Sequence, residues 1–237
     1  LTGTTYQELA ANVAEAKGIP IVSLHYFPFR ANNQILPIRL PAQLVEPLWS
    51  IGEWSHWRLL KQAYDEQRRT LGLAPSRTRA VRRMFDGGAL EVQAYDRVIF
   101  PGLEAEWGDQ RPLVGAMTLE LSTNFDGSVM SWIEAGSAPI YFGFGSMPVD
   151  RPAETVALIL NTCRELGERA LICSGALPFK GNVVTSDFMI VPSINHAKIF
   201  PRCRAIVHHG GAGTTAASVR SGIPTLVLWV SADQPLW

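Results

Sequence analysis

The second half of the chain, from about residue 118 to residue 237, alternates short apolar segments with amphipathic ones. Helical spacing of apolar residues predicts three helices, over residues 152–166, 197–200 and 214–221. Apolar segments of strand length predict five strands, over residues 139–144, 170–173, 188–191, 205–207 and 225–230. Continuous apolar strands joined by helices are typical of a parallel sheet that helices cover on both faces. We therefore predict a doubly wound α/β domain over residues 118–237.

The first part, residues 1–117, is less regular. A helical pattern over residues 6–17 ends at Gly18, and the apolar segment 19–24 then reads as a parallel strand. Because the chain opens with a helix before this strand, we expect earlier strands of the same domain to lie outside the chain. Two further segments, residues 97–100 and 112–114, are predicted to be closing strands.

A long helix is predicted over residues 43–71, because apolar side chains recur there at steps of three and four. These side chains are Leu44, Leu48, Ile51, Trp54, Trp57, Leu60 and Tyr64. Packing in the core is the favoured interpretation of this stripe, and a lid over an acceptor site is the alternative. The basic residues that follow, Arg77, Arg79, Arg82 and Arg83, suit a solvated face, with attraction to an anionic lipid surface as the alternative.

Composition narrows the class of protein. Lys plus Arg number 21 and Asp plus Glu number 21, so the chain lacks the positive excess of a dedicated nucleic-acid binder. No apolar segment approaches the length that crosses a bilayer. The 3 cysteines are too few and too scattered for a disulfide framework or a thiolate metal site. We expect a cytoplasmic protein.

The strongest chemical signal runs from Ile206 to Ala217, where a buried strand enters a glycine-rich turn that opens into a helix. Glycines let backbone amides approach a ligand closely, and the N-terminus of a helix attracts an anion. Thr214 could cap this helix and bond a phosphate oxygen. His209, at the carboxyl end of the strand, is placed to donate a hydrogen bond to the same phosphate.

Two weaker motifs lie at the same predicted sheet edge. Glycines at 143 and 145 follow the first strand of the domain and could form a second wall of a phosphate pocket. Asp233 and Gln234 follow the last strand and precede Pro235. They could cap a following helix, or they could grip vicinal hydroxyls of a sugar.

These motifs, in this order, resemble the donor-binding signature of family 1 nucleotide-sugar glycosyltransferases. The matching segments are 142–147, 191–192, 195–201, 208–215, 221–224 and 233–235, which read closest to the bacterial and sterol-glucosyltransferase branch. The resemblance implies the GT-B fold, with two Rossmann-like α/β domains. Residues 1–117 would be the incomplete acceptor-binding domain and residues 118–237 the donor-binding domain, truncated at its end.

The resemblance also implies roles for single residues, all of them expectations. The donor-binding residues would be Ser146, Val191, Ile194, His209, Gly211, Gly213, Thr214, Asp233 and Gln234. In the first domain, the similarity to members that glycosylate envelope lipids implies a hydrophobic or lipid acceptor and a contact with the inner face of the membrane. His25, Phe27, Trp54 and Trp57 would line the acceptor site. Ala217 stands where the plant branch has a ribose-binding glutamate, so the choice among UDP, dTDP and GDP donors stays open.

The implied reaction is an inverting transfer of a hexose to an acceptor hydroxyl, with neither a metal nor another cofactor. The family's catalytic base lies early in the acceptor domain, so we expect it upstream of this chain, and His25 is a weak candidate. Two alternatives remain open at this point. One is a nucleotide-sugar epimerase, and the other is a non-catalytic nucleotide-sugar-binding subunit.

Overall fold

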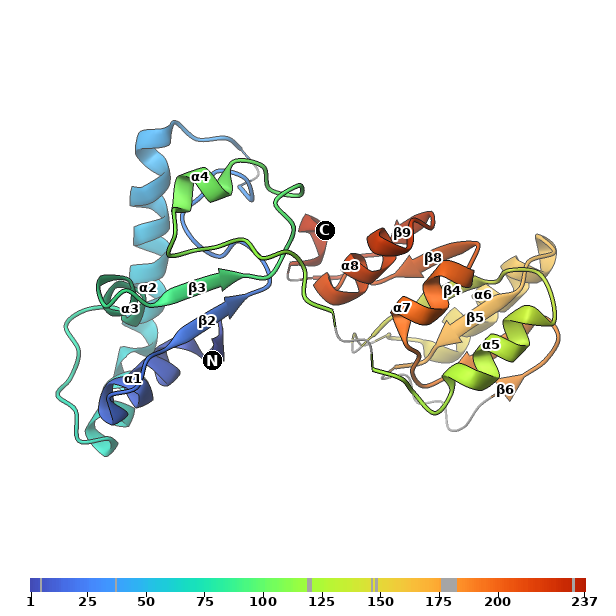
Figure 1. Ribbon diagram of the computed structural model, residues 1–237, viewed down its shortest axis with the longest axis horizontal. Coiled ribbons are helices and arrows are strands. Elements are labelled where there is room, and N and C mark those ends of the chain that lie inside the picture. Colours follow the sequence, from blue (N-terminus) through green and yellow to red (C-terminus); the bar gives the residue numbers. More distant parts are fainter. Residues whose placement is uncertain are drawn as a thin grey trace. The chain divides into compact units, whose positions relative to one another are not determined.

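The computed structural model describes residues 1–237 apart from 5, 37, 119–120, 146, 148, 176–182 and 232. The chain forms two compact units, Leu1–Met117 and Thr118–Trp237, which we call unit 1 and unit 2 (Figure 1). Each unit is an α/β structure built on a parallel sheet, and the two are described separately below.

Unit 2 carries a sheet with the strand order β6-β7-β5-β4-β8-β9. In sequence the strands are β4 (Ile140–Gly143), β5 (Ala170–Cys173), β6 (Val183–Val184), β7 (Phe188–Val191), β8 (Ala205–His208) and β9 (Thr225–Val227). The short β6 pairs antiparallel with β7, and the other pairings are parallel. The connecting elements are α5 (Asp126–Glu134), α6 (Pro152–Glu165), α7 (His196–Ile199), η1 (Phe200–Arg202), α8 (Ala212–Ser221) and η2 (Gln234–Leu236).

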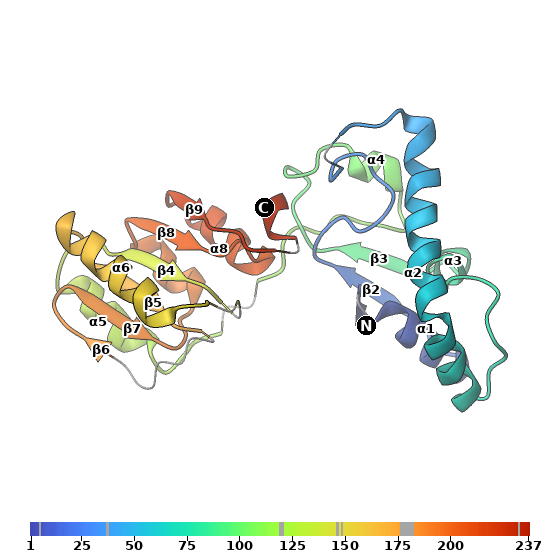
Figure 2. The same cartoon turned by 180° about the vertical axis from the view of Figure 1, so that it is seen from behind.

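Helices cover both faces of this sheet, as the apolar pattern predicts. Alternate residues of β5 point to opposite faces, so that Leu171 and Ile172 enter two different cores. Ile172 packs with Ile159 of α6, whereas Leu171 belongs to the core formed with α5, α7, η1 and α8. Figures 1 and 2 show α6 on one face and these other helices on the opposite face. The prediction of a doubly wound sheet in this half is confirmed.

Unit 1 contains a three-stranded parallel sheet of order β1-β2-β3. The strands are β1 (Thr2–Gly3), β2 (Val22–His25) and β3 (Leu90–Gln93), and the helices are α1 (Gln7–Lys17), α2 (Ala42–Thr70), α3 (Ala80–Asp86) and α4 (Leu103–Trp107). The strand predicted over residues 97–100 is wrong, because that segment forms turns. Residues 112–114, also predicted to be a strand, form one isolated bridge, between Leu113 and Gln93. The β1 strand precedes α1, so the chain does not open with a helix.

One face of the unit 1 sheet is polar and yet buried. Its side chains are Thr2, Ser23, His25, Glu91 and Gln93, each at most 9% exposed. Ser23 lies opposite both Thr2 and Glu91 in the register, and His25 lies opposite Gln93. Glu91 accepts hydrogen bonds from two guanidinium groups, those of Arg30 and Arg111. Ionic and polar contacts therefore hold this face, where an apolar core would be usual.

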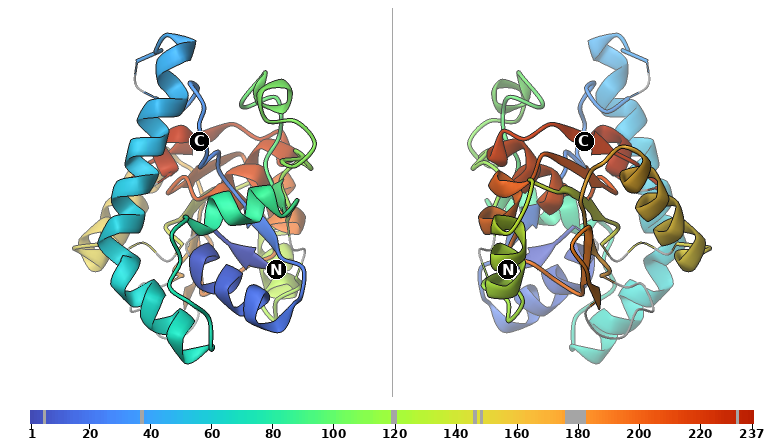
Figure 3. Two further views of the ribbon diagram at one scale, coloured as in Figure 1. Left: turned by 90° about the vertical axis from the view of Figure 1, so that its left-hand side faces the viewer. Right: turned by 90° about the vertical axis from the view of Figure 1, so that its right-hand side faces the viewer.

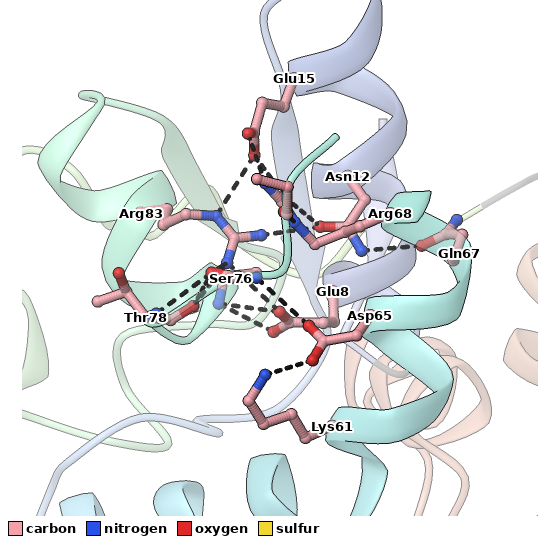
Figure 4. A network of polar contacts seen from close by, with 12 residues as sticks. Glu8, Asn12, Glu15, Lys61, Asp65, Gln67, Arg68, Ser76, Thr78 and Arg83 are labelled. Carbon is pink, nitrogen blue, oxygen red and sulfur yellow. Dashed lines mark hydrogen bonds and ion pairs between the residues drawn. The ribbon is translucent and has the colours of Figure 1, made fainter. Parts of the chain in front are cut away.

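A polar network also ties α1 to α2 and α3 (Figure 4). Arg68 is the buried residue of α2, and its guanidinium donates to Glu15, Asn12 and the carbonyl of Ala74. Arg83 of α3 donates to the same Asn12 side chain, at 2.8 Å. Charged and amide groups thus anchor the C-terminal half of α2 against α1.

The apolar stripe of α2 is largely exposed, so its interpretation as core packing is wrong. Leu48, Ile51 and Trp54 are 49%, 60% and 54% exposed. Trp57 and Tyr64 are half-buried and line a cavity described below. Figure 3 shows α2 running along the outside of unit 1. The periodicity predicted the helix correctly, but it carried no information about what lies against the apolar face.

Candidate functional site

The glycine turn between β8 and α8 brings backbone amides to the carboxyl edge of the unit 2 sheet. Gly210 has φ +84°, and a Cβ there would lie 2.8 Å from Val227 Cγ1. The first helical bond of α8 runs from the N–H of Thr215 to the carbonyl of Gly211, at 2.9 Å. The amides of residues 212–214 precede that bond and so have no partner within the helix. This helix end is therefore suited to an anion.

Thr214 does not cap α8, contrary to the sequence prediction. Gly211 occupies the N-cap position, without a side-chain hydrogen bond, and Thr214 lies inside the first turn. The helix thus begins two residues earlier than its pattern of apolar residues suggests. The Thr214 side chain lines the cavity that the turn borders, which leaves its hydroxyl available to a ligand there.

His208 is fully buried and joins the turn to α8. Its Nδ1 accepts a hydrogen bond from the Gly210 N–H at 3.0 Å, and its Nε2 lies 3.3 Å from Ser218 Oγ. Burial, together with the neighbouring His209 and His196, lowers the pKa of His208 to about 4. The imidazole is therefore neutral near pH 7, with its proton on Nε2.

His209 lies between the two glycine loops. A Cβ on Gly145 would be 2.6 Å from His209 Cε1, and a Cβ on Gly211 would be 2.5 Å from His209 Nε2. Glycine at both positions is what makes room for this imidazole. The Nδ1 atom of His209 is buried and has no hydrogen-bond partner within the described residues.

A cavity of about 190 Å³ lies at the carboxyl edge of the sheet, beside this imidazole. Its lining comprises Tyr141, Gly143, Gly145, Cys173, Pro192, Ser193, Ile194, His196, His209 and Thr214. Ile194 lines this cavity and also belongs to the core, and Val191 is fully buried in the same core. Ser146 lies outside the described residues. Tyr141 and Cys173 were not predicted, although both belong to strands that end at this edge.

Asp233 and Gln234 are engaged by the chain itself. Gln234 Oε1 accepts from the N–H groups of Val230 and Ser231, at 2.7 and 3.1 Å. Asp233 Oδ2 accepts from Trp237 Nε1, at 2.7 Å. A Cβ on Gly210 would lie 3.2 Å from Gln234 Cβ, so this segment packs against the glycine turn. Asp233 precedes η2, but its side chain does not cap that helix.

Unit 1 holds a larger cavity of about 610 Å³, between α2 and the loop that follows β2. Its apolar and aromatic lining comprises Phe29, Leu36, Leu40, Leu48, Trp49, Trp57, Tyr64 and Val81, and charged residues such as Glu8, Arg30, Glu53 and Arg79 complete it. Phe27 belongs to a row of aromatic rings that continues through Phe29 to Trp49. Trp54 is exposed on the outer side of α2. Such a lining suits an apolar ligand.

His25 lies beneath this cavity, fully buried. Its Nε2 lies 3.2 Å from Gln7 Oε1, an atom that only accepts, so Nε2 carries the proton. Burial and the nearby Arg30 lower the pKa of His25 to about 4. The ring is thus a neutral base whose Nδ1 has no partner among the described residues. Gln7 faces the cavity, and His25 lies behind it.

The described residues contain no group of three or more His, Cys, Asp or Glu side chains arranged to hold a metal ion. Of the helices in the same part of the chain, none combines the length and the apolar character needed to cross a membrane.

Comparison with known proteins adds a family. Residues 168–237 match the C-terminal domain described as erythromycin biosynthesis protein CIII-like. Over 238 residues the chain is 56% identical to the uncharacterized glycosyltransferase Rv1524 of Mycobacterium tuberculosis, and it covers 58% of that protein. It is 31% identical over 242 residues to the sterol 3-beta-glucosyltransferase UGT80B1 of Arabidopsis thaliana, covering 95% of this chain and 38% of the relative.

A solved structure with a similar fold is also known. The structure of Os79 from O. sativa in complex with UDP superimposes with a TM-score of 0.57 at 14% identity, covering 96% of this chain and 58% of the other. The chain thus spans 58% of both Rv1524 and Os79, and 38% of UGT80B1. The relatives Rv1524 and UGT80B1 are glycosyltransferases by name, which does not favour the epimerase alternative. With the ordered motifs of unit 2 and the two parallel sheets, these matches relate the chain to the family 1 glycosyltransferases and show the GT-B fold.

Proposed function

We propose that the protein to which this chain belongs transfers a hexose from a nucleoside-diphosphate sugar to a hydroxyl of a hydrophobic or lipid acceptor. The observation that carries the proposal is the cavity where His209, Thr214 and the N-terminus of α8 meet at one sheet edge. The likeness to a fold solved with bound UDP supports the donor class.

On the donor side, the helix end and His209 supply the interactions that a departing nucleoside diphosphate requires. Free amides of α8 and the imidazole can donate hydrogen bonds to phosphate oxygens as negative charge develops there. These groups supply electrostatic stabilisation without an ion, so we propose a metal-independent reaction. Single displacement at the anomeric carbon then gives inversion. We place the catalytic base outside this chain, because His25 is buried behind Gln7.

On the acceptor side, the cavity of about 610 Å³ supports an apolar acceptor. Its aromatic walls suit a ring system or an acyl chain, and the sterol glucosyltransferase relative acts, by its name, on such a compound. The exposed apolar residues of α2 support a further part of the proposal, a peripheral contact with a lipid surface. Leu48, Trp57 and Tyr64 of the stripe line the cavity, and Leu48 is also 49% exposed.

The test is a transfer assay with the full-length protein, radiolabelled UDP-glucose or dTDP-glucose, and a sterol or glycolipid acceptor. We expect labelled product whose anomeric configuration, determined by NMR, is inverted relative to the donor. The rate of transfer should be equal with and without EDTA. Isomerised nucleotide sugar without acceptor would indicate an epimerase. Nucleotide binding without transfer until a second polypeptide is added would indicate the non-catalytic subunit. A loss of nucleotide binding in EDTA would contradict metal independence.

A further inference from the structure

Two imidazoles share the cavity of unit 2. His196 is the first residue of α7, and His209 follows β8, yet both line the same space together with Thr214. The His196 ring stacks on Phe200, with centroids 4.5 Å apart and planes 22° apart. Its Nε2 lies 3.5 Å from the Tyr141 hydroxyl oxygen. His196 is thereby held in one orientation at the cavity wall.

The charges around His196 favour an anion. The cavity lining contains no carboxylate among the described residues. From the elements packed around the ring come Tyr141 of β4, Cys173 of β5, His208 of β8 and His209. Burial raises the pKa of both Tyr141 and Cys173 and lowers that of His208, which keeps these three groups neutral. On α7 itself, Lys198 is exposed. The carboxylate of Asp126 on α5 accepts hydrogen bonds from the backbone N–H groups of Thr123 and of Asn195, the residue before His196.

The surroundings of His196 oppose a proton on this imidazole. Burial, and then the neighbouring His209, lower the pKa of this imidazole. A bound diphosphate would oppose both effects through its charge, because it brings negative charge into a space that otherwise holds two imidazoles and the positive end of α8.

We propose that His196 is a second imidazole ligand of the donor diphosphate, and that it takes up one proton from solvent when the donor binds. This inference rests on the proposed function and deepens it. His209 and His196 then approach the diphosphate from two elements, and the proton on His196 stays in place to neutralise the departing nucleotide. Release of that nucleotide returns the proton to solvent.

The sign of the pH dependence follows from linkage. Donor affinity should rise as pH falls through the pKa of His196 in the complex, and it should level off below the pKa in the free protein. One proton gives at most about tenfold in dissociation constant per pH unit. At high pH, where neither state binds the proton, affinity should not change with pH.

The experiment is isothermal titration calorimetry of the full-length protein with UDP-glucose, between about pH 6 and pH 8, in two buffers of different ionisation enthalpy. UDP-glucose is the probe because its diphosphate diester does not titrate in this range, whereas the terminal phosphate of UDP does. The difference between buffers gives the number of protons taken up. We expect uptake in the wild type, and less uptake with a flatter pH dependence in His196→Gln, which should lose about tenfold in affinity at the acidic end.

Lys198→Gln is the matched control, since it removes an exposed positive charge from the same helix and should leave proton uptake unchanged. Equal uptake in His196→Gln and wild type would overturn the inference. If His196→Gln does not fold, the His196 ring-proton shift in the wild type, followed by NMR with and without UDP-glucose, decides the question. A pKa that does not rise on binding overturns the inference. Absence of binding by both UDP-glucose and dTDP-glucose would instead overturn the proposed donor class, and this inference with it.

Discussion

The Nδ1 atom of His208 accepts a hydrogen bond from the backbone N–H of Gly210, at 3.0 Å. This bond fixes the proton of His208 on Nε2, which faces Ser218 Oγ, and Ser218 in turn donates to the carbonyl of Thr215. The glycine turn is thereby connected to the first turns of α8. The next residue, His209, lines the cavity instead. Two adjacent imidazoles thus have different surroundings, and their replacement should have different effects.

His209→Ala should weaken nucleoside-diphosphate binding by about 1.5–3 kcal/mol, the range for a hydrogen bond to a charged group. That corresponds to roughly ten- to a hundredfold in dissociation constant. His208→Ala should instead lower the free energy of unfolding by about 2–4 kcal/mol, because it leaves a cavity and an unpaired Gly210 N–H. Calorimetry and urea denaturation measure the two quantities. If His208→Ala lost affinity for the nucleoside diphosphate and His209→Ala kept it, the phosphate site would be assigned one residue out of register.

Two glycines of the turn form a second pair of variants. Gly210→Ala should unfold or strongly destabilise unit 2, since φ is +84° and the new Cβ would meet Val227 Cγ1 at 2.8 Å. Gly213→Ala should leave stability unchanged or raise it by up to about 1 kcal/mol, because the site is helical and no atom lies within 4 Å of the new Cβ. If the diphosphate contacts Gly213 closely, as the family resemblance implies, this variant should nevertheless bind UDP more weakly. A stable Gly213→Ala protein with unchanged affinity would remove Gly213 from the site.

Stability should fall in acid because of the buried histidines. In the folded protein His25 and His208 have a pKa of about 4, against an ordinary value of 6.5. Their contribution is therefore complete above pH 6.5 and is lost as pH falls toward 4, by about 2 kcal/mol per histidine at pH 5. Urea denaturation at about pH 7.5 and pH 5 measures it. His208→Gln should show a shallower loss than wild type, whereas the exposed His56→Gln should not. Equal losses in all three proteins would refute this account.

Vesicle binding tests the outer face of α2. Replacing Ile51 and Trp54 by Gln should reduce partitioning to anionic vesicles at least about tenfold, since each apolar side chain buried in the interface is worth more than about 1.4 kcal/mol. The control is Leu158→Gln on α6, where the leucine is 67% exposed and belongs to the other unit. Identical partitioning of all three proteins would argue that the stripe has another role.

Unit 2 could be predicted closely because its strands are continuous apolar segments. The predicted strands at 170–173 and 188–191 coincide with β5 and β7. The predicted bounds are wrong where strand pairing or helix capping sets the end of an element. The apolar segment continues to Val230, but β9 ends at Val227 and the following residues are exposed. Helix α8 has a glycine at its N-cap, whereas the sequence predicts Thr214 as the cap.

Unit 1 could be predicted less well, since its sheet reverses the usual pattern. Glu91 and Gln93 are buried, so β3 does not read as a strand in the sequence. At the site, motif order indicated which loops meet, but side-chain direction depends on tertiary contacts. Val191 points into the core, and the side-chain oxygens of Asp233 and Gln234 are bound by their neighbours. The motifs alone predict neither the burial of Val191 nor the hydrogen bonds that Asp233 and Gln234 form within their own segment.

The polar face of the unit 1 sheet also determines how its strands align. Shifting β2 by one residue against β3 would turn Val22 and Leu24 toward Glu91 and its two arginines, and would place His25 on the opposite face. Buried charges without partners cost several kcal/mol, so such a misalignment is disfavoured from the first contacts between the strands. Polar side chains therefore specify the register of these strands. The strands of unit 2 are apolar on both faces, so their register depends on the loops and helices that join them.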